Sequence, residues 1–148
     1  MKFYKNEKIE NLIFDFDGVI LDSVKIKNDS FKELVKNYDR NIQIKFFDHH
    51  ISNLGLSRYK KFAYLKKLLS KNKNYKYKNI PKKFKDILNR KIKKAKLING
   101  VKNFLKKNKK KKLFISSGTP NFDLKIIVKR YKIHKYFLEI LGSPRSKM

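Results

Sequence analysis

The chain has no cysteine among its 148 residues. It can therefore build neither a disulfide framework nor a thiolate metal site, which fits a cytoplasmic location. Long hydrophobic runs are missing as well, since no apolar stretch approaches the roughly 18 residues that a membrane span needs. The first residues also lack the apolar region of a signal peptide. These absences predict a cytoplasmic protein with no membrane partner. The length of 148 residues suits one domain, or one core with a small insertion.

Acidic residues are scarce, because 12 Asp and Glu stand against 40 Lys and Arg and give a formal net charge of +28. Clustered lysines can neutralise the phosphates of a nucleic acid. Here the lysines are spread over the whole chain, and arginine, which suits base contacts and bidentate phosphate contacts better, is rare. We therefore expect no specific nucleic-acid partner, but a general attraction for anionic substrates.

Two carboxylates close together stand out against this basic background. Asp15 and Asp17 follow an apolar run that is typical of a buried strand, and Gly18 comes next in a predicted turn. Because the strand ends here, both acids can turn toward one site. No Lys or Arg separates them, and a hard cation would relieve their repulsion. Mg²⁺ typically binds one or two carboxylates together with substrate phosphates, and an Asp can also attack phosphorus.

Residues 22 to about 96 have a helical pattern, with apolar side chains recurring three and four positions apart. Pro81 is typical of the first turn of a helix. Residues 72–79 form a polar Lys, Asn and Tyr stretch and are expected to be a loop.

The pattern changes from Leu97 onward, where strands are predicted at about 112–118 and 136–141. Thr119 and Pro120 are expected to open the helix between them, as N-cap and first helical residue. Strand–helix–strand alternation predicts an α/β fold with a parallel sheet and right-handed crossovers. Ligands of such sheets bind beyond the carboxyl ends of the strands, where the acidic pair and the later polar turns would converge.

The segment from Asp15 to Ser23 resembles the first motif, DxDGxxxDS, of the haloacid dehalogenase-like (HAD) phosphohydrolases. Residues 114–120 resemble the second motif of this family, and residues 141–147 resemble the third. The resemblance implies phosphate binding by Ser117, with Ser116 as the alternative, and by Gly118 and Lys147. It also implies a Rossmann-like parallel-sheet core at residues 1–21 and 97–148, with an α-helical C1 cap inserted at 22–96.

Within that cap, the segment around Gly55 and Arg58 resembles the cap loop of phosphoglycolate-phosphatase-like and phosphoglucomutase-like members. Arg58 could clamp a phosphate or carboxylate of the substrate, and Lys61 could add charge. The alternative is a helix start capped by Ser57 with solvated basic residues. His49 and His50 next to Asp48 could suggest a metal site, but a polar helix end is the favoured interpretation.

The mechanism implied by the resemblance uses Asp15 as nucleophile and Asp17 as general acid and base. Mg²⁺ would bind Asp15 and the main-chain carbonyl of Asp17, while Ser117 and Lys147 hold the phosphoryl oxygens of a small phosphorylated metabolite. The alternatives are a phosphosugar mutase and a non-catalytic binding or assembly module.

The sequence departs from the family pattern in one respect. The family's fourth, acidic motif and its last two strands are not found, so the core is expected to be incomplete. The resulting open sheet edge predicts an oligomer or a complementing polypeptide as partner.

Overall fold

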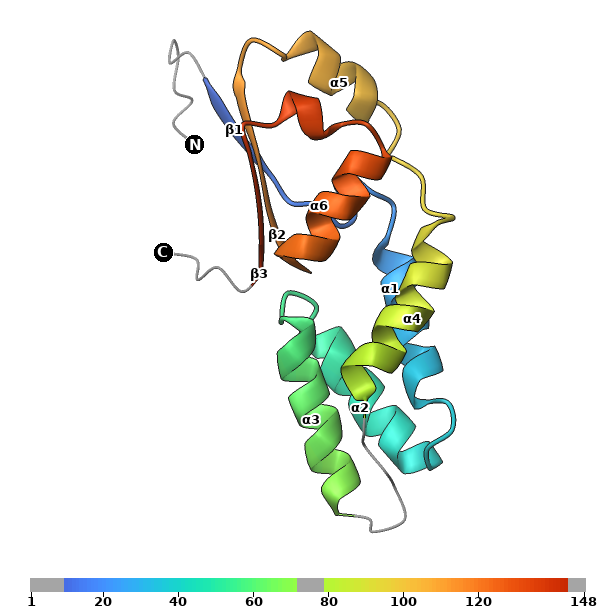
Figure 1. Ribbon diagram of the computed structural model, residues 1–148. Coiled ribbons are helices and arrows are strands. Elements are labelled where there is room, and N and C mark those ends of the chain that lie inside the picture. Colours follow the sequence, from blue (N-terminus) through green and yellow to red (C-terminus); the bar gives the residue numbers. More distant parts are fainter. Residues whose placement is uncertain (1–9, 72–78, 144–148) are drawn as a thin grey trace, which may run out of the picture. The chain divides into compact units, whose positions relative to one another are not determined.

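The computed structural model describes residues 10–71 and 79–143. The chain divides into two compact units, and Figure 1 shows the elements of each. The first unit holds the described residues up to Ile20 and those from Leu97 onward, and the second holds Leu21–Lys96. A helical segment is therefore inserted into a discontinuous α/β unit.

The α/β unit is built on a parallel sheet, which confirms the predicted fold class. The strands β1 (Asn11–Phe14), β2 (Lys112–Pro120) and β3 (Glu139–Ser143) follow one another in the order β1-β2-β3. Phe14 is in register with Ile115, and Ile115 with Ile140. The carboxyl ends of β1 and β2 therefore lie side by side, where ligands of parallel sheets bind.

Two helices cover one face of this sheet, α5 (Val101–Lys107) and α6 (Asn121–Arg130) (Figure 1). Each follows one strand and precedes the next, and successive right-handed crossovers in one direction place both helices on the same side. Ile115 is fully buried there, and the rings of Phe14 and Phe104 meet edge to face at 5.9 Å. Ile13 points to the opposite face and is 73% exposed.

The helical unit consists of α1 (Val24–Val35), α2 (Arg40–Ser52), α3 (Arg58–Ser70) and α4 (Ile80–Ile92). Its core is aromatic, with the rings of Phe31 and Phe84 stacked at 4.3 Å and Phe62 packed against both. Pro81 lies in the first turn of α4, as predicted. The loop predicted at 72–79 lies outside the described residues except for Asn79, which has a positive φ of 65°.

The two ends of the helical unit meet. The N–H of Asp22 donates to the carbonyl of Lys96 at 2.9 Å. Next to this pair in the chain, and within the α/β unit, the N–H of Ile98 donates to the carbonyl of Ile20 at 3.0 Å. The chain therefore leaves the sheet unit and returns to it at neighbouring points.

Two boundary predictions are wrong. The third strand begins at Glu139 rather than at 136, because His134–Tyr136 forms the 3₁₀ turn η1 first. The helix predicted between the last two strands, α6, begins at Asn121, because Pro120 still belongs to β2. Thr119 does not cap this helix.

None of the described helices combines the length and apolar character that a membrane crossing requires.

Candidate active site

The acidic pair lies in the turn that follows β1. Phe16 separates the two acids and is only 1% exposed, so its ring anchors the turn in the core. The N–H of Phe16 donates to Oδ1 of Asp15 at 2.6 Å, and that of Ile20 donates to the carbonyl of Phe16 at 3.0 Å. Gly18 has a φ of +77°, a left-handed conformation that a side chain would disfavour. The turn is thereby fixed, with Asp15 exposed and Asp17 half-buried.

The carboxyl end of β2 supplies two hydroxyl groups to Asp17. Oγ1 of Thr119 donates to Oδ2 of Asp17 at 3.1 Å, and Oγ of Ser117 approaches the same oxygen at 3.5 Å. The N–H of Thr119 donates to Oγ of Ser117 at 3.1 Å. The structure therefore brings together Asp17 and Ser117, which come from two separate sequence motifs.

An irregularity in the sheet directs Thr119 inward. Ser117 is in register with Gly142, but the next matched residue of β2 is Pro120, so Gly118 and Thr119 fall in the register shift. The shift leaves Thr119 3% exposed, with its hydroxyl on Asp17. The sequence alone does not mark Thr119 as a site residue, because its position before a proline is also typical of a helix cap.

Gly142 allows β3 to approach this irregular segment. A Cβ at Gly142 would lie 2.5 Å from Cα of Asn121 and 2.5 Å from the carbonyl oxygen of Thr119. Both are main-chain atoms, which cannot give way as a flexible side chain could. The N–H of Gly142 also donates to Oδ1 of Asn121 at 3.2 Å.

The remaining predicted site residues are Gly118, Lys147, Arg58 and Lys61. Gly118 is exposed at the end of β2, and Lys147 lies outside the described residues. Arg58 is the first residue of α3, in the helical unit, and its guanidinium carbon lies 5.6 Å from the ring centre of Phe84. Ser57 precedes α3 without a capping hydrogen bond from its side chain.

Lys61 is buried in the helical unit, only 2% exposed. Its Nζ donates to Nδ1 of His50 at 2.8 Å. Burial lowers the pKa of Lys61 to about 8, with a further contribution from the positive charge of Lys27. Burial likewise lowers the pKa of His50 to about 4, assisted by Lys61 and His49. His50 lies in the last turn of α2, as the interpretation of a polar helix end expects, but it is buried there, and no sequence spacing signals its pairing with Lys61.

The described residues contain no group of three His, Asp or Glu side chains that could hold a metal ion. Asp15 and Asp17 nevertheless form a donor set that suits a hard cation, because Mg²⁺ needs only one or two protein carboxylates when phosphate and water complete its shell. The residues present therefore fit Mg²⁺.

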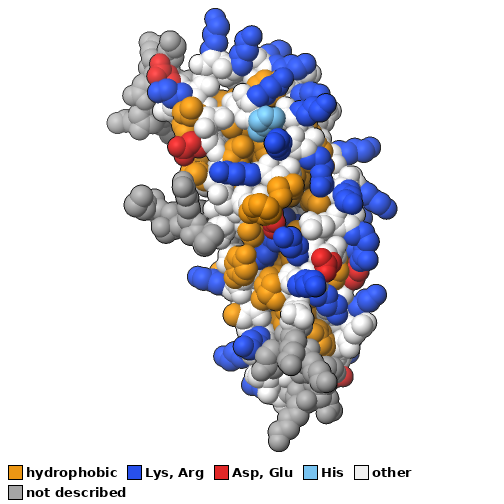
Figure 2. All heavy atoms as spheres, viewed as in Figure 1, with side chains coloured by type: hydrophobic (Ala, Val, Ile, Leu, Met, Phe, Trp, Pro, Cys, Tyr) orange, Lys and Arg blue, Asp and Glu red, His pale blue; other side chains and the backbone are white. Residues whose placement is uncertain are grey.

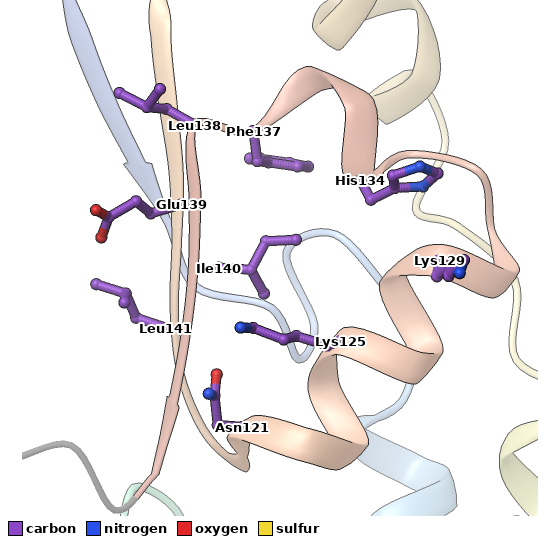
Figure 3. A pocket seen from close by; sticks show the side chains of 9 residues that line it. All are labelled: Asn121, Lys125, Lys129, His134, Phe137, Leu138, Glu139, Ile140 and Leu141. Carbon is purple, nitrogen blue, oxygen red and sulfur yellow. The ribbon is translucent and has the colours of Figure 1, made fainter.

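On the face that Figure 2 shows, the basic side chains of the described residues mark no second site. Figure 2 shows Lys and Arg scattered over the visible face rather than gathered in one patch. A groove of about 600 Å³ lies between α6 and β3, and Figure 3 shows Ile140 and Phe137 pointing toward α6 while Glu139 and Leu141 point the other way. Lys125 and Lys129 border this groove, but none of the site carboxylates or hydroxyls does.

The sequence matches the family model described as haloacid dehalogenase-like hydrolase over residues 12–147. No protein of curated function matches it. Among solved structures, a proposed beta-phosphoglucomutase from Thermotoga maritima is similar, with 22% identity and a TM-score of 0.65 over 95% of this chain and 64% of that one. A predicted phosphoglycolate phosphatase from Haemophilus somnus has 16% identity and a TM-score of 0.65 over 95% and 65%.

A proposed HAD hydrolase, YfnB from Bacillus subtilis, whose structure is described as bound to magnesium, has 15% identity and a TM-score of 0.64 over 93% and 66%. At these identities the likeness concerns the fold. The chain spans less than two thirds of the length of the proposed beta-phosphoglucomutase and of a proposed Clostridium difficile phosphatase, 64% and 62%.

Proposed function

Because the chain belongs to the haloacid dehalogenase-like hydrolase family, we propose that it is a Mg²⁺-dependent phosphatase for a small phosphorylated metabolite, acting in the cytoplasm. One observation carries the proposal. The hydroxyls of Ser117 and Thr119 converge on the Asp17 carboxylate in the turn that also holds Asp15. The residues proposed as nucleophile, as acid and base, and as hydroxyl donor thus lie at the carboxyl end of a parallel sheet.

In the proposed reaction, an oxygen of Asp15 attacks phosphorus as the bond to the leaving oxygen breaks, which gives an aspartyl-phosphate. Asp17 protonates the leaving oxygen and then takes a proton from the water that attacks phosphorus, releasing phosphate and restoring Asp15. The Ser117 hydroxyl donates to a phosphoryl oxygen. When bound, Mg²⁺ would neutralise charge on the transferring group, with the Asp15 carboxylate and the Asp17 carbonyl as ligands.

The helical unit is proposed to select the substrate. The Arg58 guanidinium can form a bidentate pair with a second anionic group of the substrate, such as a carboxylate. Lys147 is proposed to offset charge on the transferring phosphoryl group.

Hydrolysis of a generic aryl phosphate with and without Mg²⁺ tests this function. We expect turnover that requires Mg²⁺ and is abolished in Asp15→Asn, whose side chain keeps its shape but loses its charge. Asp86→Asn, an exposed change in the helical unit, is the matched control and should leave turnover intact. Turnover that survives Asp15→Asn would exclude Asp15 as the nucleophile, and a folded but inactive chain would contradict the proposal for these 148 residues.

The β1 surface supports a separate proposal about partners. Within the part of the chain that the structure describes, β1 pairs only with β2, and Ile13 is largely exposed. We propose that this surface is covered by a second copy or by a complementing polypeptide. A dimer in light scattering that Ile13→Lys dissociates would support a second copy, whereas a monomer would exclude it.

A further inference from the structure

A chain of hydrogen bonds crosses the helical unit and takes no part in the proposed chemistry. Nζ of Lys61 on α3 donates to Nδ1 of His50 on α2, at 2.8 Å, and Nε2 of His50 lies 2.9 Å from Oδ1 of Asn28 on α1. The same ammonium also lies 3.5 Å from the carbonyl oxygen of Leu54, in the turn between α2 and α3. Lys61 and His50 together thus connect three helices with one turn.

The direction of these bonds follows from the chemistry of the groups. An ammonium has donors only, so Nδ1 of His50 must accept, and the proton on Nε2 is then free to donate to Asn28. His50 is neutral at neutral pH, since its pKa is lowered to about 4, and it can serve as this acceptor. Both His50 and Lys61 are 2% exposed, so water cannot replace either partner.

Burying the Lys61 ammonium is unfavourable in this charged environment, so packing alone does not explain a lysine at this position. Among the described residues no carboxylate pairs with its ammonium, and the neighbouring charge that the structure shows, Lys27 on α1, has the same sign. The ring of Phe31, 5.4 Å from Nζ, gives partial compensation. A methionine would fill the same space without the desolvation penalty.

The turn that Lys61 contacts leads directly into Arg58. The side-chain amide of Asn53 donates to the carbonyl of His49 at 2.9 Å, and the N–H of Leu56 donates to the carbonyl of Asn53 at 3.0 Å. A Cβ at Gly55 would have nothing within 4 Å. Hydrogen bonds to α2 therefore hold the start of the turn. The middle of the turn is open, and the Lys61 ammonium lies near the Leu54 carbonyl there.

We propose that Lys61 is a positioning residue that holds the turn at residues 53–57, through His50 and the Leu54 carbonyl, so that Arg58 is presented in one conformation. This assignment rests on the proposed substrate-binding role of Arg58. It replaces direct substrate contact by Lys61, whose buried ammonium is already engaged by His50.

Amide hydrogen exchange of the 148-residue chain tests the proposal without requiring turnover. We expect Lys61→Met to speed exchange at residues 53–58 by about tenfold, while amides in the middle of α1 and α4 exchange at the wild-type rate or more slowly. His50→Leu should have the same local effect, because it removes the acceptor. His50→Gln is the matched control and should retain protection, since the Gln amide offers one acceptor and one donor in similar places.

Unchanged exchange at residues 53–58 in Lys61→Met would overturn the proposal and leave Lys61 as a buried packing residue. Faster exchange throughout the helical unit would overturn it too, since the loss would then be global. A second readout compares KM for 2-phosphoglycolate, which carries a carboxylate, with KM for phenyl phosphate, which does not. Lys61→Met and Arg58→Ala should both raise KM for 2-phosphoglycolate about tenfold more than KM for phenyl phosphate. Absence of turnover, or no effect of Arg58→Ala, would count against the proposed function, whereas the exchange result would still decide the role of Lys61.

Discussion

Thr119 and Asp17 are 102 positions apart in the chain, yet the Thr119 hydroxyl donates to the Asp17 carboxylate at 3.1 Å. Ser117 approaches the same carboxylate oxygen and has only one hydroxyl proton. When Ser117 donates that proton to a phosphoryl oxygen, Thr119 still holds Asp17. The two hydroxyls therefore have different expected roles, although they lie on the same strand end.

Replacing Thr119 by Val should remove this donor while nearly preserving the side-chain volume. A hydrogen bond to a charged group contributes about 1.5–3 kcal/mol, so we expect kcat to fall by about 10- to 100-fold with little change in KM. Steady-state kinetics on an aryl phosphate measures both constants. Thr119→Ser retains the hydroxyl and should recover most of the rate, and an equal loss in both variants would argue for packing instead.

Ser117→Ala should lower kcat/KM by about 10²- to 10³-fold, the loss typical of removing one donor to a developing negative charge. The adjacent Ser116→Ala is the internal control and should stay close to wild type. The sequence did not exclude Ser116 as the phosphate-binding serine. A larger loss of kcat/KM in Ser116→Ala than in Ser117→Ala would assign phosphate binding to Ser116 instead.

Gly142→Ala should disrupt the sheet next to the site. Its Cβ would lie 2.5 Å from main-chain atoms of Thr119 and Asn121, so β3 must shift, and overpacking of this kind typically costs about 1–3 kcal/mol. We expect a lower midpoint in chemical denaturation and reduced turnover. Gly55→Ala, where the added methyl meets nothing within 4 Å, should change stability little. Equal midpoints for both variants would contradict the close approach of β3.

The stability of the helical unit should rise with pH in two windows. The pKa of His50 is lowered from 6.5 to about 4 and that of Lys61 from 10.5 to about 8, so the unfolded chain binds more protons within each interval. The free energy of unfolding should therefore increase between pH 4 and 6.5, and again between pH 8 and 10.5, by at most about 3 kcal/mol in each.

Urea denaturation across this pH range checks the two increases. His50→Gln should remove the lower one and Lys61→Met the upper one, while each leaves the other in place. Glu33 gives a separate signal, because its hydrogen bond with Lys91 lowers its pKa, and the stability it contributes is lost as pH falls below about 4.5. A flat profile in wild type from pH 8 to 10.5 would show that Lys61 is not buried as a cation.

Local sequence patterns predicted the elements well where one physical signal dominated. The apolar run before Asp15 predicted β1, and Pro81 predicted the start of α4, because each constrains the backbone by itself. Thr119 and Pro120 carried two signals, since the pair suits both a helix cap and an irregular strand end. The pairing of β2 with β3 decided between them, and pairing is not a local property.

Side-chain partners were harder to predict than elements. The contact between Lys61 and His50 depends on how α2 and α3 pack, and lysine is a residue type usually found on the surface. In a chain so rich in lysine, nothing in the composition distinguishes the buried one.

The bond between the N–H of Asp22 and the carbonyl of Lys96 has a consequence for how the sheet is assembled. Pairing β1 with β2 in an unfolded chain would close a loop of roughly 100 residues, whereas a helical unit that has already folded brings its own ends together. With the helical unit folded, the remaining loop is roughly a quarter as long, and by the logarithmic dependence of loop-closure entropy on length this lowers the entropic cost of forming the sheet by about 1 kcal/mol. The folded insertion would thus keep the chain segments that form β1 and β2 close together. Helical inserts of different size could occupy the same position as long as their ends meet in this way.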